Sequence, residues 1–218
     1  KNMSITEKKK KEKEELGGKV KLVSSSKNKP ESDNKETYNA RQRIFGENKI
    51  QEMTDKWESL PKDIQWHMVG HVQRNKVKYM SPLVKLIHAV DSLKLLKEIN
   101  KEGKKNERVI DCLIQIKIAE EESKFGISAD EAREILKSDA YSGFQHVKVT
   151  GLMGMATFTD DMEQVKKEFL KLKGTFDDLK KDFEDFDILS MGMSGDYKVA
   201  VECGSNMVRI GSSIFGER

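Results

Sequence analysis

The segment ILSMGMSGDYKVAVECGSNMVRIGSS, residues 188–213, contains two short apolar runs, each followed by a loop of glycine and serine. Runs of this length and composition are typical of buried β-strands. Similar runs recur upstream, and amphipathic helical stretches lie between them. The expected strands are Val20–Ser25, Arg43–Phe45, Gln65–Val69, Leu86–Val90, Val109–Ile118, Val147–Met153, Ile188–Met191 and Met207–Ile210. Strands that alternate with helices in this way predict an α/β fold, a single (β/α)8 TIM barrel, over an open doubly wound sheet.

The helical stretches carry recognisable N-caps. Helices are expected over Glu47–Glu58, Ser92–Lys101, Ala129–Leu136 and Asp161–Phe183. Ser, Thr and Asp side chains accept hydrogen bonds from the free N–H groups of a first helical turn. The expected caps are Asp91 or Ser92, Ser128, and Thr159 or Asp160.

No Pro- or Ser-rich linker divides the chain, so one barrel domain is expected over residues 20–218. Residues 1–19 are expected to form a leading helix, with its pattern over Thr6–Leu16, that packs on the barrel. The polar content around Lys8–Lys13 mixes lysines with glutamates, which favours a solvated helix over a nucleic-acid or membrane patch.

Charge and cysteine content narrow the function classes. Lys and Arg number 40 and Asp and Glu 37, a net charge of +3, while 35% of residues are charged. Such a mixed surface argues against a nucleic-acid-binding protein. No apolar run is long enough to span a bilayer, and a cytoplasmic monomer is expected. Cys112 and Cys203 lack metal or redox spacing and are expected to be idle thiols.

The loops after the last two expected strands point to a phosphorylated ligand. Functional groups of a barrel collect at the carboxyl ends of its strands. Gly192–Asp196 and Gly211–Ser213 follow the seventh and eighth strands. Glycine lets backbone N–H groups approach phosphate oxygens, and serine adds donors. Gly and Ser also mark ordinary tight turns, but both loops together occupy the two positions that barrels use for phosphate.

Two basic residues are candidates for chemistry. Lys27 follows an apolar strand, where desolvation lowers the pKa of an amine and allows it to condense with an aldehyde. Pro30 indicates that the strand has ended, which favours Lys27 over Lys29. Arg209 lies within the last strand on the opposite face from Val208. It either points into the barrel toward a ligand or is paired with a core carboxylate.

Other signals are weaker. His67 and His71 have the spacing of a helical zinc pair, but Gly70 and the strand pattern around His67 argue against a metal site. Gly192–Asp196 departs from the G-x-S-x-G nucleophile pattern at its last position, so serine hydrolase chemistry is not expected.

Six ordered blocks of the sequence resemble the pyridoxal phosphate homeostasis protein family, whose barrel is of the alanine racemase N-terminal type. The blocks are Ser26–Pro30, Arg43–Asn48 with Gln51 and Glu52, Trp66–Gly70 with Gln73 and Asn75, Gly151–Met153, Leu189–Ser194, and Met207–Ser212 with Ile214–Gly216. Together they run from the first strand to the end of the chain.

The resemblance implies that pyridoxal 5′-phosphate (PLP) is the cofactor and is bound as a Schiff base on Lys27. By the same matching, Ser194, Gly211 and Ser212 would hold the phosphate, and Arg209 would face the pyridine nitrogen. An arginine there keeps that nitrogen unprotonated, which suits a holder of the cofactor better than a carbanion catalyst.

The matching also names Asn48 and His67 as pocket residues. Three positions depart from the family pattern: Ser24 and Ser25 replace a small apolar pair, and Arg41 replaces a glycine. These departures are expected to loosen the first strand or the helix after it.

The leading function is therefore a PLP-binding protein of vitamin B6 homeostasis, with PLP and PLP-dependent apo-enzymes as partners. The main alternative is an amino-acid racemase, which needs acid/base groups on both faces of the reacting carbon. The second base of that enzyme type comes from a further domain and a partner subunit, which are not expected here. A cofactor-free phosphosugar enzyme is the third reading, with Lys27 as an aldolase-type lysine.

Overall fold

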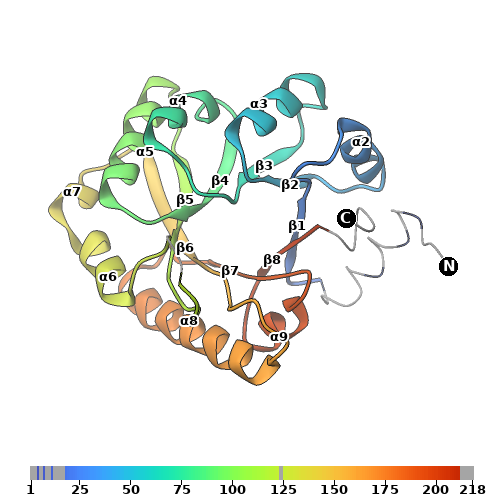
Figure 1. The fold of residues 1–218 in the computed structure, drawn as a ribbon. Coiled ribbons are helices and arrows are strands. Elements are labelled where there is room, and N and C mark those ends of the chain that lie inside the picture. The colour runs from blue at the N-terminus through green and yellow to red at the C-terminus, as the bar shows by residue number, and fades with distance from the viewer. Residues whose placement is uncertain (1–3, 5–6, 8–10, 12–17, 123–124, 212–218) are drawn as a thin grey trace.

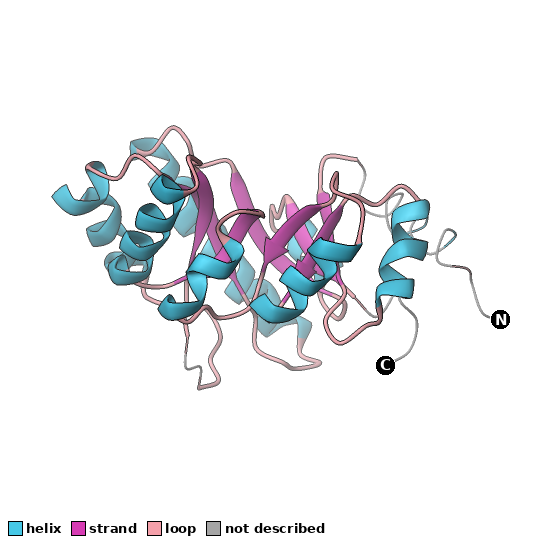
Figure 2. Ribbon diagram, turned by 90° about the horizontal axis from the view of Figure 1, so that it is seen from above, coloured by secondary structure: helices cyan, strands magenta, loops and turns pink. Residues whose placement is uncertain are grey.

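The computed structural model describes residues 4, 7, 11, 18–122 and 125–211. Eight parallel strands close into a barrel in the order β1 to β8, and the helices lie outside the ring of strands (Figure 1, Figure 2). The strands are β1 Lys21–Ser25, β2 Ile44–Glu47, β3 Gln65–Met68, β4 Val84–Val90, β5 Ile110–Gln115, β6 Val147–Gly154, β7 Ile188–Met193 and β8 Met207–Ile210. The prediction of a single (β/α)8 barrel is confirmed.

The helices follow the strands in turn. They are α2 Glu31–Asn39, α3 Ile50–Ser59, α4 Val77–Met80, α5 Leu93–Lys105, α6 Ala129–Lys137, α7 Asp139–Ser142, α8 Met162–Asp182 and α9 Tyr197–Glu202, with a 3-10 turn over Arg74–Lys76. The leading helix expected over Thr6–Leu16 falls largely outside the described residues.

Most expected boundaries differ from those of the structure by one to four residues, and two of the differences have a clear cause. The helix predicted from Glu47 begins at Ile50, because Glu47 is the last residue of β2 and Lys49 is still extended. The strand predicted to reach Ile118 ends at Gln115, and Ile116 instead forms an isolated bridge to Ile127.

The caps of three helices test the capping predictions. Ser92 caps α5 by accepting from the Leu95 amide, and Ser128 caps α6 in a capping box, so both predictions are confirmed. The cap of α8 was predicted at Thr159 or Asp160, which is wrong. The carboxylate of Asp161 accepts hydrogen bonds from the Glu163 and Gln164 amides in the first turn of this helix, at 3.1 and 3.3 Å.

Side chains on alternate strand positions fill two separate layers. One inner cluster includes both Val23 of β1 and Leu113 of β5, and because these strands lie on opposite sides of the barrel, the cluster extends across its interior. A larger outer core lies between strands and helices. There α8 packs one face, including Phe169 and Leu172, at helical spacing. Each strand therefore has one face toward the barrel interior and one toward the helices.

The departures from the family pattern are placed as follows. Ser24 is fully buried and its hydroxyl has no hydrogen-bond partner among the described residues, a situation that costs about 1–3 kcal/mol. Ser25 is half-buried. Arg41 follows the end of α2, where its amide bonds to the Tyr38 carbonyl at 2.9 Å, and its φ is 72°. That left-handed conformation is the one glycine adopts without strain at a helix end.

We expect Arg41→Gly to raise the free energy of unfolding by about 1 kcal/mol, because it removes the Cβ strain of the left-handed conformation. Urea unfolding at neutral pH measures this difference. Arg41→Ala is the matched control, since it removes the guanidinium and keeps the Cβ. An equal gain in both variants would assign the effect to the lost charge instead of the backbone.

Candidate functional site

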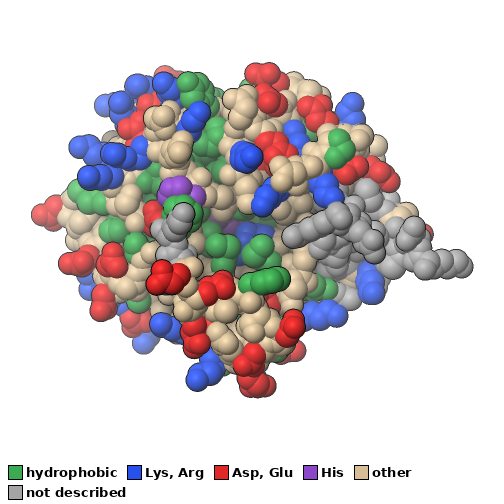
Figure 3. All heavy atoms as spheres, viewed as in Figure 1, with side chains coloured by type: hydrophobic (Ala, Val, Ile, Leu, Met, Phe, Trp, Pro, Cys, Tyr) green, Lys and Arg blue, Asp and Glu red, His purple; other side chains and the backbone are tan. Residues whose placement is uncertain are grey.

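Parallel closure brings the residues that follow each strand to one face of the barrel. The Lys27 turn follows β1, Asn48 follows β2, and Ser194 and Gly211 follow β7 and β8. Figure 3 shows basic and apolar side chains together over the middle of the barrel on the face it presents. The candidate site is assembled at the carboxyl ends of the strands, as in other barrels of this type.

Arg209 lies inside the barrel and is 5% exposed. Its guanidinium donates to the hydroxyl of Ser190 and to the carbonyl of Gly154, the latter at 3.3 Å. Among the described residues no carboxylate forms an ion pair with it. Burial lowers the pKa of Arg209 to about 10, while the carboxylate of Asp196, beyond ion-pair distance, acts to raise this pKa, and Arg209 remains a cation at neutral pH.

A chain of hydrogen bonds leads from Arg209 across the barrel to His67. Ser190 Oγ lies 3.0 Å from His88 Nδ1, and His88 Nε2 lies 2.9 Å from His67 Nδ1. The Ser190 hydroxyl has one proton and two acceptor lone pairs, so after accepting from Arg209 it can either donate to His88 Nδ1 or accept from it. These two orders correspond to the two neutral tautomers of His88, and His67 takes the complementary role at His88 Nε2. In either order the Arg209 guanidinium acts only as a donor.

Both histidines in this chain are uncharged at neutral pH. His67 is 3% exposed and His88 is fully buried. Burial lowers the pKa of His67 to about 3 and that of His88 well below its ordinary value, and the charge of Arg209 adds to the effect on His88. The interior polar chain thus joins one cation to two neutral rings.

The loops after β7 and β8 are joined at the mouth. The Gly211 amide donates to Ser194 Oγ at 3.3 Å, and the Met193 amide donates to Asp196 Oδ1 at 2.8 Å. A Cβ on Gly211 would lie 3.0 Å from the carbonyl oxygen of Ser25, so glycine lets β8 end close to β1. Two of the three expected phosphate residues are therefore brought together. Ser212 lies outside the described residues.

Lys27 occupies the second position of a turn instead of the end of the strand. The Lys29 amide closes this turn on the Ser26 carbonyl at 3.0 Å, and Asn28 has a φ of 60°. The Lys27 side chain is exposed and has no hydrogen bond or ion pair with any described residue. The dry environment expected for this amine is not observed, because the chain leaves the strand at the buried Ser26.

Asn48 is half-buried at the end of β2 and lies against Gly70, where a Cβ would come within 2.5 Å of the Asn48 carbonyl oxygen. Its side-chain amide makes no hydrogen bond within the described part of the chain. The structure therefore leaves this amide available to a ligand.

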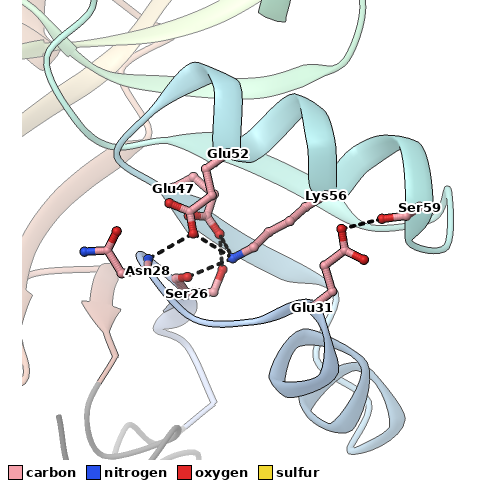
Figure 4. A network of polar contacts seen from close by, with 7 residues as sticks. All are labelled: Ser26, Asn28, Glu31, Glu47, Glu52, Lys56 and Ser59. Atoms are coloured by element: carbon pink, nitrogen blue, oxygen red, sulfur yellow. Dashed lines mark hydrogen bonds and ion pairs between the residues drawn. The ribbon is translucent and has the colours of Figure 1, made fainter.

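Sequence reasoning missed several residues of the site. His88 and Ser190 complete the interior chain, and their signal was a polar residue on an inward strand position. Lys56 and Glu47 form a buried ion pair of 2.9 Å beneath the Lys27 turn (Figure 4). A lysine in the apolar face of a helix was the signal there, with Met53 one turn earlier.

Comparisons with known proteins place this geometry in a family. Residues 35–218 match the family described as alanine racemase, N-terminal domain. The pyridoxal phosphate homeostasis protein of Helicobacter pylori (strain ATCC 700392 / 26695) is 40% identical over 200 residues, which cover 91% of this chain and 88% of that protein. The fold is that of a barrel of the alanine racemase N-terminal class. Within that class, the chain belongs to the pyridoxal phosphate homeostasis protein family.

Solved structures agree with this assignment. The structure of PipY from Synechococcus elongatus PCC7942 without PLP is 30% identical, with a TM-score of 0.92, and covers 98% of this chain and 100% of that one. The structure of the same protein with PLP bound is 29% identical, with a TM-score of 0.88 and the same coverage.

The buried imidazoles predict a pH-dependent stability. His67 has an ordinary pKa of 6.5 and a folded pKa of about 3, so between these values the unfolded chain binds a proton that the folded chain does not. The free energy of unfolding therefore falls as the pH falls from 6.5 toward 3, by up to about 1.4 kcal/mol per pH unit.

Urea unfolding at a series of pH values from about 7 down to about 4, where a histidine of ordinary pKa takes up its proton, measures this slope. We expect His67→Gln to reduce it, with His71→Gln, a substitution of an exposed histidine, as the matched control. An unchanged slope in His67→Gln would show that His67 is not kept neutral by burial.

Proposed function

We propose that this protein binds PLP, holds it covalently as a Schiff base on Lys27, and serves the homeostasis of vitamin B6 in the cytoplasm. The observation that supports this proposal most strongly is that three features share the mouth of the barrel. They are the Gly211–Ser194 hydrogen bond, the buried Arg209 and the Lys27 turn. The family membership and the PLP-bound structure of PipY support the same ligand.

The residues of the mouth fit the chemistry of this cofactor. A phosphate ester needs backbone amides and hydroxyls, which Gly211 and Ser194 offer and to which Ser212 would add. An aldehyde needs an amine, which the side chain of Lys27 offers at the same face. Bound PLP would supply an electrophilic aldehyde and a ring that can accept electrons.

The remaining site residues would set how the cofactor behaves. Arg209, a permanent cation at the pyridine nitrogen, would keep that nitrogen unprotonated and weaken the ring as an electron acceptor. His67 would contribute through His88 and Ser190 by holding Arg209 in place. The half-buried Asn48 would line the pocket with its free amide.

These features favour a holder of PLP over a dedicated enzyme. Relatives are named for PLP homeostasis, and an arginine at the pyridine nitrogen opposes carbanion chemistry. The partners would be PLP itself and PLP-dependent apo-enzymes, with the protein acting as a monomer and without nucleic acid. Among the described helices none is both long and apolar enough to cross a membrane.

The cofactor assignment predicts a visible absorption band in the purified protein incubated with PLP. Borohydride should abolish this band and leave the cofactor attached to the peptide that contains Lys27, because reduction makes a Schiff base permanent. Lys27→Ala should lack both the band and the attachment. Lys29→Ala, which alters a half-buried lysine of the same turn, should retain them.

A colourless wild type after incubation with PLP would contradict the cofactor assignment and favour the phosphosugar reading. A wild type that has the band and also interconverts L- and D-alanine at enzymatic rates would favour the racemase instead of the holder.

A further inference from the structure

Lys56 projects from α3 toward Ser26, the first residue of the turn that contains Lys27, and is 4% exposed (Figure 4). Its ammonium group lies 2.9 Å from the Ser26 carbonyl oxygen, 2.9 Å from Glu47 Oε2 and 3.1 Å from Glu52 Oε2. An ammonium group has three N–H donors, and each of them has an acceptor here. Lys56 is therefore fully engaged and is not itself a nucleophile.

The two glutamates of this network also hold the turn. Glu47 accepts a hydrogen bond from the hydroxyl of Ser26, and Glu52 accepts one from the backbone amide of Asn28 at 2.9 Å. The residues before and after Lys27 are thus both fixed by charged side chains of β2 and α3. Asn28, whose amide Glu52 accepts, has a left-handed φ of 60°.

Stability alone does not account for charges at this depth. Replacing a buried ion pair with apolar side chains is often neutral or stabilising. Here Glu47 is fully buried, its Oε1 has no partner among the described residues, and burial raises the pKa of its carboxyl. The distinctive property of the network is that all three charged side chains contact the same turn. Lys56 and Glu52 bind its backbone, and Glu47 binds the hydroxyl of Ser26.

We propose that Glu47, Glu52 and Lys56 are positioning residues that fix the backbone on both sides of Lys27 and so hold its amine at the barrel mouth. The role assigned to that amine rests on the proposed function. Because the backbone of Lys27 is already fixed, only its side chain has to be ordered when the cofactor attaches, which reduces the conformational entropy lost on attachment.

Lys56→Met tests this proposal because it preserves most of the side-chain volume and removes the ammonium. Hydrogen exchange of the Asn28 and Lys29 amides, measured without cofactor, should accelerate about tenfold or more. The affinity for PLP should fall by about tenfold, equivalent to about 1.4 kcal/mol. The visible circular dichroism of bound PLP should also change, because it reports how the linkage is oriented.

Two further variants guard against an effect on folding alone. Glu52→Ala removes the acceptor of the Asn28 amide at a side chain that is 21% exposed, and it should reproduce the faster exchange if Lys56→Met does not fold. Lys56→Arg, which retains a cationic donor, should restore part of the PLP affinity.

Gln42→Ala is the matched control for destabilisation. Gln42 is buried, and its side-chain amide donates to the Leu22 and Ile44 carbonyls at 2.7 and 2.8 Å. It therefore joins β1 and β2 near their first residues, at the opposite end from the Lys27 turn. This variant should lower the unfolding temperature while leaving turn exchange, PLP affinity and circular dichroism at wild-type values.

Wild-type exchange and wild-type PLP binding in both Lys56→Met and Glu52→Ala would overturn the proposal. Faster exchange with unchanged affinity and circular dichroism would also overturn it, because the network would then support the turn without positioning the amine. A wild type that does not bind PLP would overturn the proposed function instead, and amide exchange would then decide alone whether the network fixes the turn.

Discussion

The pairing of the first strand with the last is the constraint on which the site depends. The register of β1 with β8 runs from Lys21 opposite Met207 to Ser24 opposite Ile210, and it closes the barrel. The residues that follow both strands consequently emerge next to each other, and a Cβ at position 211 would lie only 3.0 Å from the Ser25 carbonyl oxygen. Two segments far apart in sequence, the Lys27 turn and the Ser194–Gly211 contact, are brought to one mouth by this closure.

Two buried cations on either side of the sheet are accommodated in different ways. Lys56, on the helix side, is neutralised by carboxylates and uses all its donors on the turn and its supports. Arg209, on the inner side, meets a hydroxyl and a carbonyl instead, so its charge is not cancelled by a direct ion pair with any described residue. The first arrangement holds the backbone still, and the second retains a positive potential inside the barrel.

The sequence was sufficient for the barrel because short apolar runs, turn residues and caps such as Ser128 are local signals. It also located Lys27, Ser194 and Gly211 in the segments that follow strands, and Arg209 on an inward face. It could not give the interior chain, because the contact of His67 with His88 depends on the register of the neighbouring strands β3 and β4, and that of His88 with Ser190 depends on β4 and β7 facing each other across the barrel. The exposure of Lys27 was missed for a related reason, since the turn that moves it away from the strand is held by Lys56, a residue 30 positions from Ser26.

The hydrogen bonds inside the barrel have a consequence for proton movement. A row of hydrogen bonds passes a proton through only if the group at its end can accept one, and a guanidinium cannot accept. Because Arg209 ends the row, a proton handed along His67, His88 and Ser190 has no acceptor at that end. The row is therefore closed to proton passage at Arg209, in contrast to the relays that acid–base catalysts build from the same residue types.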